Sequence, residues 1–276
     1  MEVSRMSTTF VLIGGNEDIY PREPVFLAIT NELDSDSRIR IFPTASSYPE
    51  STSETYCHQF ESMGFTDVSV LRVLSRDDGK DSDTIEQVNQ ANAIFFVGGD
   101  QSRLVRKVKD TPLHSALQGR IGEDIVLSGT SAGAMAMSEV MIAGGGAGQA
   151  LRKGEIPIKE GLALLPDLVL DTHFIARNRF YRLVHALSEH PSKTGIGITN
   201  DTAVMLRDES AVVIGTDVTT FLRGNGISFN NSGNLEPSGR IGVGSLELSV
   251  IPFGHKINLE TFGMSKTDLP YPVTHR

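Results

Sequence analysis

The chain is poor in the residues that build covalent, metallic or aromatic scaffolds. Its 276 residues include one cysteine, Cys57, and no tryptophan, and aromatic residues make up only 7%. A single cysteine excludes an internal disulfide framework and argues against a structural zinc site. The scarcity of aromatic side chains disfavours a stacking platform for sugars or bases. No apolar run approaches the roughly 20 residues that a membrane-spanning helix needs.

Basic residues are also fewer than acidic ones, with 25 lysines and arginines against 34 aspartates and glutamates. The formal net charge is -9 and the isoelectric point is near 5.3, which argues against a general nucleic-acid binder. An apolar content of 39% and a mean hydropathy of -0.10 are ordinary for a soluble globular protein. The first seven residues lack the apolar segment of a secretory signal, so we expect a cytoplasmic protein. We see neither an internal repeat nor a clear linker and expect one domain over residues 1–276.

Apolar runs typical of strands alternate with helical spacing through the first half of the chain. We expect strands at 9–13, 39–42, 68–73, 93–97 and 125–127, and helices at 24–33, 51–63, 85–92, 102–109 and 112–123. This alternation predicts an α/β fold with a mostly parallel sheet and helices on both faces. The functional loops of such a sheet lie at the carboxyl ends of its strands.

The most informative stretch is Gly129-Thr-Ser-Ala-Gly133, a G-x-S-x-G pattern between an apolar strand and small residues that suit a helix over 132–140. In that context the pattern predicts a nucleophile elbow, with Ser131 exposed at a sharp turn and the Ala132 amide at a helix N-terminus. The pattern alone is weak, because it arises by chance in roughly a quarter of chains this rich in glycine and serine. A serine that merely caps a helix is the alternative.

A serine nucleophile needs a neighbouring base, and His173 is the best placed of the seven histidines. It ends a strand expected at 168–170 and precedes a helix expected at 177–187. Arginines crowd the first turns of that helix, at the end where its dipole disfavours cations. We therefore favour an anion-binding role for Arg177, Arg179 and Arg182.

The last third of the chain predicts short strands in an antiparallel extension. We expect 195–198 and 203–206 to pair around a turn, with further strands at 211–214, 218–222 and 246–251. Residues 225–239 are rich in asparagine, serine and glycine and are typical of a loop or hairpin. The tail from 265 to 276 has no core pattern and is expected to be mobile.

Four motifs in order give the chain a family resemblance. They are Gly98-Gly-Asp-Gln101, Gly129-Thr-Ser-Ala-Gly-Ala134, Asp171-x-His-Phe-x-x-Arg-x-Arg-x-x-Arg-Leu183 and Gly195-Ile-Gly-Ile-x-x-Asp-Thr-Ala203. Together they resemble cyanophycinases, relatives of peptidase E, over roughly residues 11–207. The resemblance implies a flavodoxin-like or class I glutamine-amidotransferase-like core and a serine exopeptidase without metal or cofactor. Cyanophycinases release β-Asp-Arg dipeptides from cyanophycin, a poly-aspartate with arginine on each β-carboxyl. A homodimer is implied as well.

Carried over by position, the resemblance makes Ser131 the nucleophile, His173 the base and the amides of Gly99 and Ala132 the oxyanion hole. The substrate-binding residues that it implies are Gln101, Asp171, Thr172, Arg177, Arg179 and Arg182. Cationic side chains suit an anionic backbone, and a guanidinium in the substrate suits a carboxylate such as Asp171.

Two positions depart from the family pattern. The family glutamate is Asn200 here, and an amide can orient His173 but cannot stabilise the imidazolium with charge. Asp201 is an alternative acid. Thr172 stands where cyanophycinases commonly have glutamine. These departures keep two alternatives open: a peptidase E-like dipeptidase for short aspartyl peptides, and a weakly active or inactive binding homologue. A generic α/β-hydrolase esterase fits less well, because its acid precedes its histidine in the chain.

Overall fold

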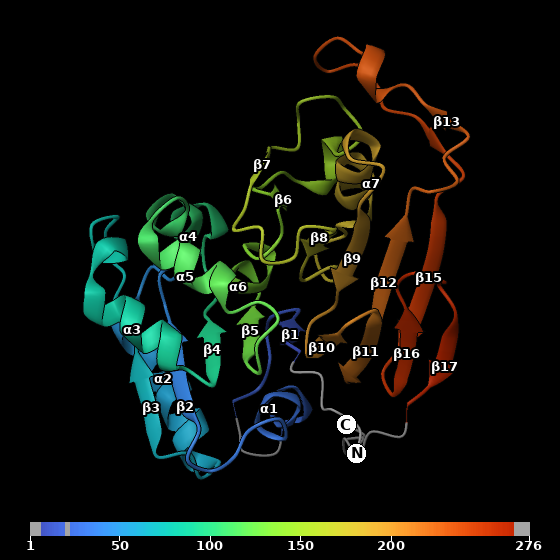
Figure 1. Cartoon of the computed structure of the whole chain (residues 1–276). Coiled ribbons are helices and arrows are strands. Elements are labelled where there is room, and N and C mark those ends of the chain that lie inside the picture. Colours follow the sequence, from blue (N-terminus) through green and yellow to red (C-terminus); the bar gives the residue numbers. More distant parts are fainter. Residues whose placement is uncertain (1–6, 20–22, 268–276) are drawn as a thin grey trace.

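The computed structural model describes residues 7–19 and 23–267, which form two main β-sheets with helices packed on them (Figure 1). Within these residues the larger sheet has nine strands, in the spatial order β17-β16-β11-β10-β1-β5-β4-β2-β3. Its strands are β1 (Thr9–Ile13), β2 (Arg38–Phe42), β3 (Asp67–Val70), β4 (Ala93–Phe96), β5 (Val126–Thr130), β10 (Thr202–Arg207), β11 (Ser210–Gly215), β16 (His255–Asn258) and β17 (Met264–Lys266).

On one side of β1, the neighbours in the order β1-β5-β4-β2-β3 pair in parallel. On its other side, the neighbours in the order β1-β10-β11-β16-β17 pair antiparallel. The expected α/β fold with a parallel sheet and a C-terminal antiparallel extension is therefore confirmed. The helices of the parallel half are α1 (Pro24–Thr30), α2 (Pro49–Ser62), α3 (Ser82–Gln90), α4 (Gln101–Val108) and α5 (Pro112–Gly119).

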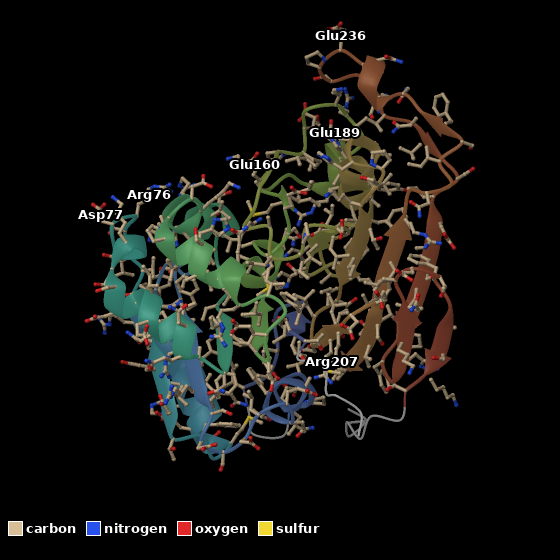
Figure 2. All side chains as sticks on the ribbon, viewed as in Figure 1. Arg76, Asp77, Glu160, Glu189, Arg207 and Glu236 are labelled. Carbon is tan, nitrogen blue, oxygen red and sulfur yellow. The ribbon has the colours of Figure 1, made fainter. Side chains whose placement is uncertain are left out.

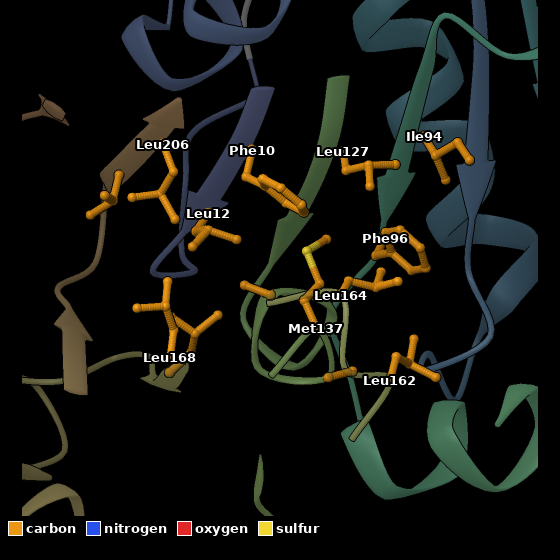
Figure 3. Packing of buried hydrophobic residues seen from close by; sticks show 14 of the residues in the cluster. Phe10, Leu12, Ile94, Phe96, Leu127, Met137, Leu162, Leu164, Leu168 and Leu206 are labelled. Carbon is orange, nitrogen blue, oxygen red and sulfur yellow. The ribbon is translucent and has the colours of Figure 1, made fainter. Parts of the chain in front are cut away.

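Helices cover both faces of the parallel strands. Successive strand residues point to opposite faces, so Phe95 and Phe96 of β4 enter different cores. On one face Phe95 packs against Phe26 of α1 and Phe60 of α2, with ring centroids 6.1 and 5.7 Å away. On the other, Phe96 joins a buried cluster with Leu127, Met137 and Leu164 (Figure 3). Burial on both faces explains why these strands read as continuous apolar runs.

A second sheet, in the order β15-β12-β9-β8, lies beside the first and differs from expectation. It contains β8 (Leu168–Asp171), β9 (Thr194–Ile198), β12 (Val218–Arg223) and β15 (Glu247–Pro252). The expectation that β9 would pair with β10 around the turn between them is wrong, because β9 bonds to β8 and β12 while β10 bonds to β1 and β11. Both strands are buried and apolar, so their pattern does not specify a partner.

The helix after Ser131 is shorter than expected. It is the single turn α6 (Ala132–Met135), and the chain then forms β6 (Val140–Ile142), which pairs with β7 (Ile158–Glu160). The carbonyls of Ala136 and Met137, which a longer helix would use internally, accept instead from the amides of Leu162 and Leu164 at 2.8 and 2.9 Å. Tertiary hydrogen bonds thus replace the helix that the small residues predicted.

The remaining elements complete the second half of the chain. Helix α7 spans Phe180–Glu189, three residues later than the expected start, and packs on β8 and β9. The expected loop or hairpin contains β13 (Phe229–Asn230), which pairs with β14 (Val243–Gly244). Short 3-10 helices occupy η1 (Asp78–Lys80), η2 (Ala147–Gln149) and η3 (Ser232–Asn234). The expected mobile tail begins inside β17, and its residues 268–276 lie outside the described part of the chain.

Charged side chains lie at the periphery of the molecule. Labelled side chains such as Arg76, Asp77 and Glu236 project from the outer elements (Figure 2). In the described ranges no helix is both long and apolar enough to cross a bilayer.

Candidate active site

Ser131 sits on a strained turn between β5 and α6. Its backbone has φ 50° and ψ -115°, a region that side-chain-bearing residues rarely adopt. The turn brings α6 so close to β4 that a Cβ at Gly133 would lie 2.1 Å from the carbonyl oxygen of Phe96. The elbow predicted from G-x-S-x-G is therefore present, and the alternative of a simple capping serine fails, since Ser131 makes no side-chain cap bond to α6.

The side chain of Ser131 meets His173, which follows β8. Ser131 Oγ and His173 Nε2 are 2.9 Å apart, and His173 adopts a left-handed backbone with φ 48°. Because Nε2 is the acceptor for a serine proton, the imidazole proton belongs on Nδ1. His173 Nδ1–H then donates to the side-chain amide oxygen Oδ1 of Asn200, at 2.7 Å. The chain thus brings Ser131, His173 and Asn200 into one hydrogen-bonded line, and their catalytic roles stay predictions.

Asp201, the alternative acid, does not take the place of Asn200. Its carboxylate hydrogen-bonds with Asn16, and its Oδ1 is buried without a hydrogen-bond partner within residues 7–19 and 23–267. Burial raises the pKa of Asp201, an effect that the Asn16 bond opposes. The orienting group of His173 is consequently a neutral amide.

The end of β1 ties the three loops of the site together. The carbonyl oxygens of Ile13, Gly14 and Gly15 accept from the amides of Ser131, His173 and Asp201, at 3.0, 2.8 and 3.1 Å respectively. Gly15 has φ +94°, and a Cβ there would lie 2.4 Å from the His173 ring. Glycine-rich loops commonly follow strands, so Gly14-Gly15 is weak evidence of a site in the sequence alone, and the fold is what reveals their contacts.

The expected oxyanion loop lies next to the nucleophile. A Cβ at Gly98 would stand 3.4 Å from the Cβ of Ser131, and Ala132 is the first residue of α6. Neither the Gly99 amide nor the Ala132 amide donates to another backbone group among the described residues. Both are free to bind an oxyanion, and that role stays a prediction. Gln101 follows this loop as the first residue of α4, and its Nε2 donates to the backbone carbonyl oxygen of Ile142 at 2.8 Å.

The residues expected to bind substrate divide into buried and accessible groups. Asp171 and Thr172 are fully buried, and Arg182 is 3% exposed. The Arg182 guanidinium donates two hydrogen bonds to the Asp171 carboxylate, one of them from Nε to Oδ2 at 2.5 Å. Burial raises the pKa of the Asp171 carboxyl, and the positive charge of Arg182 opposes this shift. In this structure the pair stabilises the end of β8, and it leaves little surface for a ligand.

Arg177 and Arg179 are more accessible. Arg179 donates to the carbonyl oxygen of Thr172 at 2.6 Å and is half-buried, whereas Arg177 is exposed. Burial lowers the pKa of His173, and the charges of these two arginines lower it further. They therefore act on the imidazole electrostatically, and a substrate-binding role for each stays a prediction.

An α/β fold that presents a serine to an oriented imidazole places the chain in the class of serine-type hydrolases. The family model of peptidase family S51 matches residues 10–214. The chain therefore belongs to that family and is a serine-type peptidase.

Relatives and solved structures agree with this assignment. The cyanophycinase of Geminocystis herdmanii (strain PCC 6308) is 37% identical over 260 residues, which cover 93% of this chain and 95% of that protein. The cyanophycinase of Trichormus variabilis (strain ATCC 29413 / PCC 7937) is 33% identical over 255 residues, covering 91% and 86%. The crystal structure of a peptidase from an acI-B1 Actinobacterium shares the fold, with a TM-score of 0.62 and 23% identity over 88% of this chain and 97% of that one.

Gly15→Ala should disable the site while leaving the fold intact. The new methyl group would collide with the His173 ring, so we expect the rate of Ser131 labelling by a fluorophosphonate to fall at least about tenfold. Gly122→Ala is the matched control, because Gly122 has φ +92° and a Cβ there would meet nothing within 4 Å. Both variants should lose about 1 kcal/mol of unfolding free energy from backbone strain. Equal labelling rates in the two variants would contradict the role assigned to Gly15.

Arg182→Leu should act on stability. Removing the guanidinium leaves the buried Asp171 carboxylate with only the longer, 3.4 Å ion pair to Arg179, so we expect a loss of about 3 kcal/mol in the free energy of urea unfolding. Arg177→Leu, at an exposed position, should change it by less than about 0.5 kcal/mol. The double variant Arg182→Leu/Asp171→Leu should recover part of the loss. If Arg182→Leu left stability unchanged, the pair would not be structural.

Proposed function

We propose that the protein is an exopeptidase of the cyanophycinase type, which hydrolyses cyanophycin to β-Asp-Arg dipeptides through an acyl-enzyme on Ser131. The observation that carries the proposal is the 2.9 Å contact between Ser131 Oγ and His173 Nε2 on a strained elbow. Further support comes from the name of the two relatives, cyanophycinase, whose sequences align with more than 90% of the chain.

In the proposed mechanism His173 removes the proton of Ser131 as the oxygen attacks the scissile carbonyl carbon. The amides of Gly99 and Ala132 stabilise the negative charge that develops on the carbonyl oxygen. His173 then gives the proton to the departing amine. A water molecule, deprotonated by the same imidazole, hydrolyses the ester and frees Ser131.

Asn200 sets the expected rate of this chemistry. During the reaction His173 becomes an imidazolium, which a carboxylate would stabilise by charge and an amide stabilises only by its carbonyl dipole. We infer that acylation is slow relative to an enzyme with a carboxylate at this position. The rival function, a homologue that binds arginyl-aspartate material with little or no turnover, draws its support from the same residue.

The substrate range is part of the proposal. A peptidase E-like dipeptidase would use the same serine and histidine on short aspartyl peptides, so the two activities differ in the length of the substrate they accept. A homodimer and a cytoplasmic location remain predictions from the family resemblance and the sequence.

Ser131→Ala should abolish turnover. The wild-type protein is expected to release β-Asp-Arg from purified cyanophycin, and the variant to release none, as measured by chromatography of the products. Parallel reactions with β-Asp and α-Asp dipeptides would separate polymer cleavage from dipeptidase activity. Absence of turnover of every substrate by the wild-type protein, together with tight binding, would favour the inactive binder.

Asn200→Asp should raise activity and shift its pH dependence. The base must be neutral, so kcat/KM rises with pH through the pKa of His173, which burial holds below its ordinary value in the native protein. A carboxylate at position 200 favours the imidazolium, so it raises that pKa and moves the acid limb to higher pH. At neutral pH we expect kcat to increase about tenfold or more. An unchanged pH profile in Asn200→Asp would show that this residue does not orient the base.

A further inference from the structure

A pocket of about 400 Å³ opens directly at Ser131 and His173. Its wall is formed by the loop after β1, the first half of α2 and the elbow. The lining side chains that matter below are Glu17, Ser51, Thr52, Thr55, Tyr56 and Thr130. Glu17 is the only acidic residue among the described lining residues, and none of Arg177, Arg179 and Arg182 is among them. The mechanism above gives no role to these six side chains.

The Glu17 carboxylate is fixed in place by two hydroxyl groups. Tyr56 Oη donates to Oε1, and Thr130 Oγ1 donates to Oε2, each at 2.8 Å. Thr130 is the residue before the nucleophile, so the carboxylate is anchored to the elbow itself. Among the ion pairs of the described residues none involves Glu17. The structure therefore holds an oriented carboxyl group beside the reacting serine, and no cation from residues 7–19 and 23–267 forms an ion pair with it.

The energetic state of Glu17 favours a cationic ligand. Burial raises the pKa of its carboxyl, and the negative charge of Asp201 adds to the effect, whereas the hydroxyl donors oppose it. A ligand cation at this position would stabilise the ionised carboxylate, because an opposite charge nearby favours the charged form.

The other hydroxyl groups of the pocket act as acceptors toward a ligand. Thr52 Oγ1 donates to the carbonyl oxygen of Tyr48 at 2.6 Å, and Ser51 donates to the same oxygen at 3.4 Å. Thr55 donates to the carbonyl oxygen of Ser51 at 3.0 Å. Each of these hydroxyl groups already donates its proton to an acceptor within the protein. Toward a ligand it can therefore act only as an acceptor, through its lone pairs. A wall of acceptors around a carboxylate suits a planar group with many donors and no acceptor.

We propose that this pocket is a guanidinium subsite, in which Glu17 pairs with an arginine side chain of the substrate while the scissile bond lies at Ser131. Arginine fits better than lysine, because five donors in one plane can reach the carboxylate and the surrounding hydroxyls together. The inference rests on the proposed function and adds a specificity-determining residue to it. Glu17 sets substrate preference, and the chemical step stays with Ser131 and His173.

The test compares two peptides that differ only in charge. One is a short β-Asp-Arg oligomer, and the other carries citrulline, the neutral ureido isostere, in place of each arginine. The protein variants are Glu17→Gln, which keeps the shape of the side chain but removes its charge and replaces one acceptor oxygen with an NH2 donor, and Glu50→Gln as control. Glu50 is exposed on the first turn of α2, so the control makes the same change in net charge outside this pocket.

We expect the wild-type protein and Glu50→Gln to prefer the arginine peptide over the citrulline peptide by about tenfold or more in kcat/KM. Glu17→Gln should lose most of this preference through a higher KM for the arginine peptide, with kcat and the thermal midpoint little changed. An unchanged preference would overturn the proposal. Equal losses on both peptides, accompanied by a lower thermal midpoint, would also overturn it and assign Glu17 to holding the elbow.

A binding experiment separates this inference from the proposed function. Calorimetric titration of both peptides into Ser131→Ala, with and without Glu17→Gln, measures the preference without turnover. If the wild-type protein cleaves neither peptide, the proposed function fails, whereas a preference for arginine that disappears with Glu17→Gln still supports the subsite. Equal affinities of Ser131→Ala for the two peptides would refute the subsite even in an active enzyme.

Discussion

The site depends on three backbone hydrogen bonds at the end of β1. Ser131, His173 and Asp201 come from three different loops, and their amides all bond to consecutive carbonyl oxygens of residues 13–15. The Ser131 loop follows β5 of the larger sheet, the His173 loop follows β8 of the second sheet, and the Asp201 loop connects β9 of the second sheet to β10 of the larger one. This short segment therefore also joins the two sheets at the active site. The absence of a side chain at Gly15 is what allows the imidazole to lie against it.

The sequence alone predicts the first strand, the elbow and the position of His173. The strand Thr9–Ile13 has the predicted bounds, because five buried apolar or small residues are followed by two glycines. The elbow is recognisable because G-x-S-x-G follows an apolar strand, and His173 stands out because it ends a strand between the elbow and the arginine-rich helix. These features are local: a few neighbouring residues determine each of them.

What the sequence does not reveal depends on partners distant in the chain. An apolar run identifies β9 as a strand but cannot say that it joins β8 and β12 instead of β10. Arg182 and Arg177 stand five residues apart in one motif, yet one is buried on Asp171 and the other is exposed. Likewise Asn200 and Asp201 are neighbours, and only the path of the backbone decides which of them meets His173. Family resemblance identified the position, and the fold shows its environment.

Charge is distributed unevenly around the imidazole. Burial lowers the pKa of His173, and the charges of Arg177 and Arg179 lower it further. The hydrogen bond to Asn200 opposes this shift but brings no negative charge, so the neutral form of the base is favoured. This favours the ground state that receives the serine proton and gives little help to the imidazolium that follows. The chemistry therefore requires one tautomer, in which His173 holds its proton on Nδ1, toward Asn200, and leaves Nε2 open to Ser131. Nitrogen-15 NMR of histidine-labelled protein at neutral pH tests it directly. We expect for His173 a protonated Nδ1 and an unprotonated Nε2. The opposite tautomer, or a fully protonated ring at that pH, would contradict it.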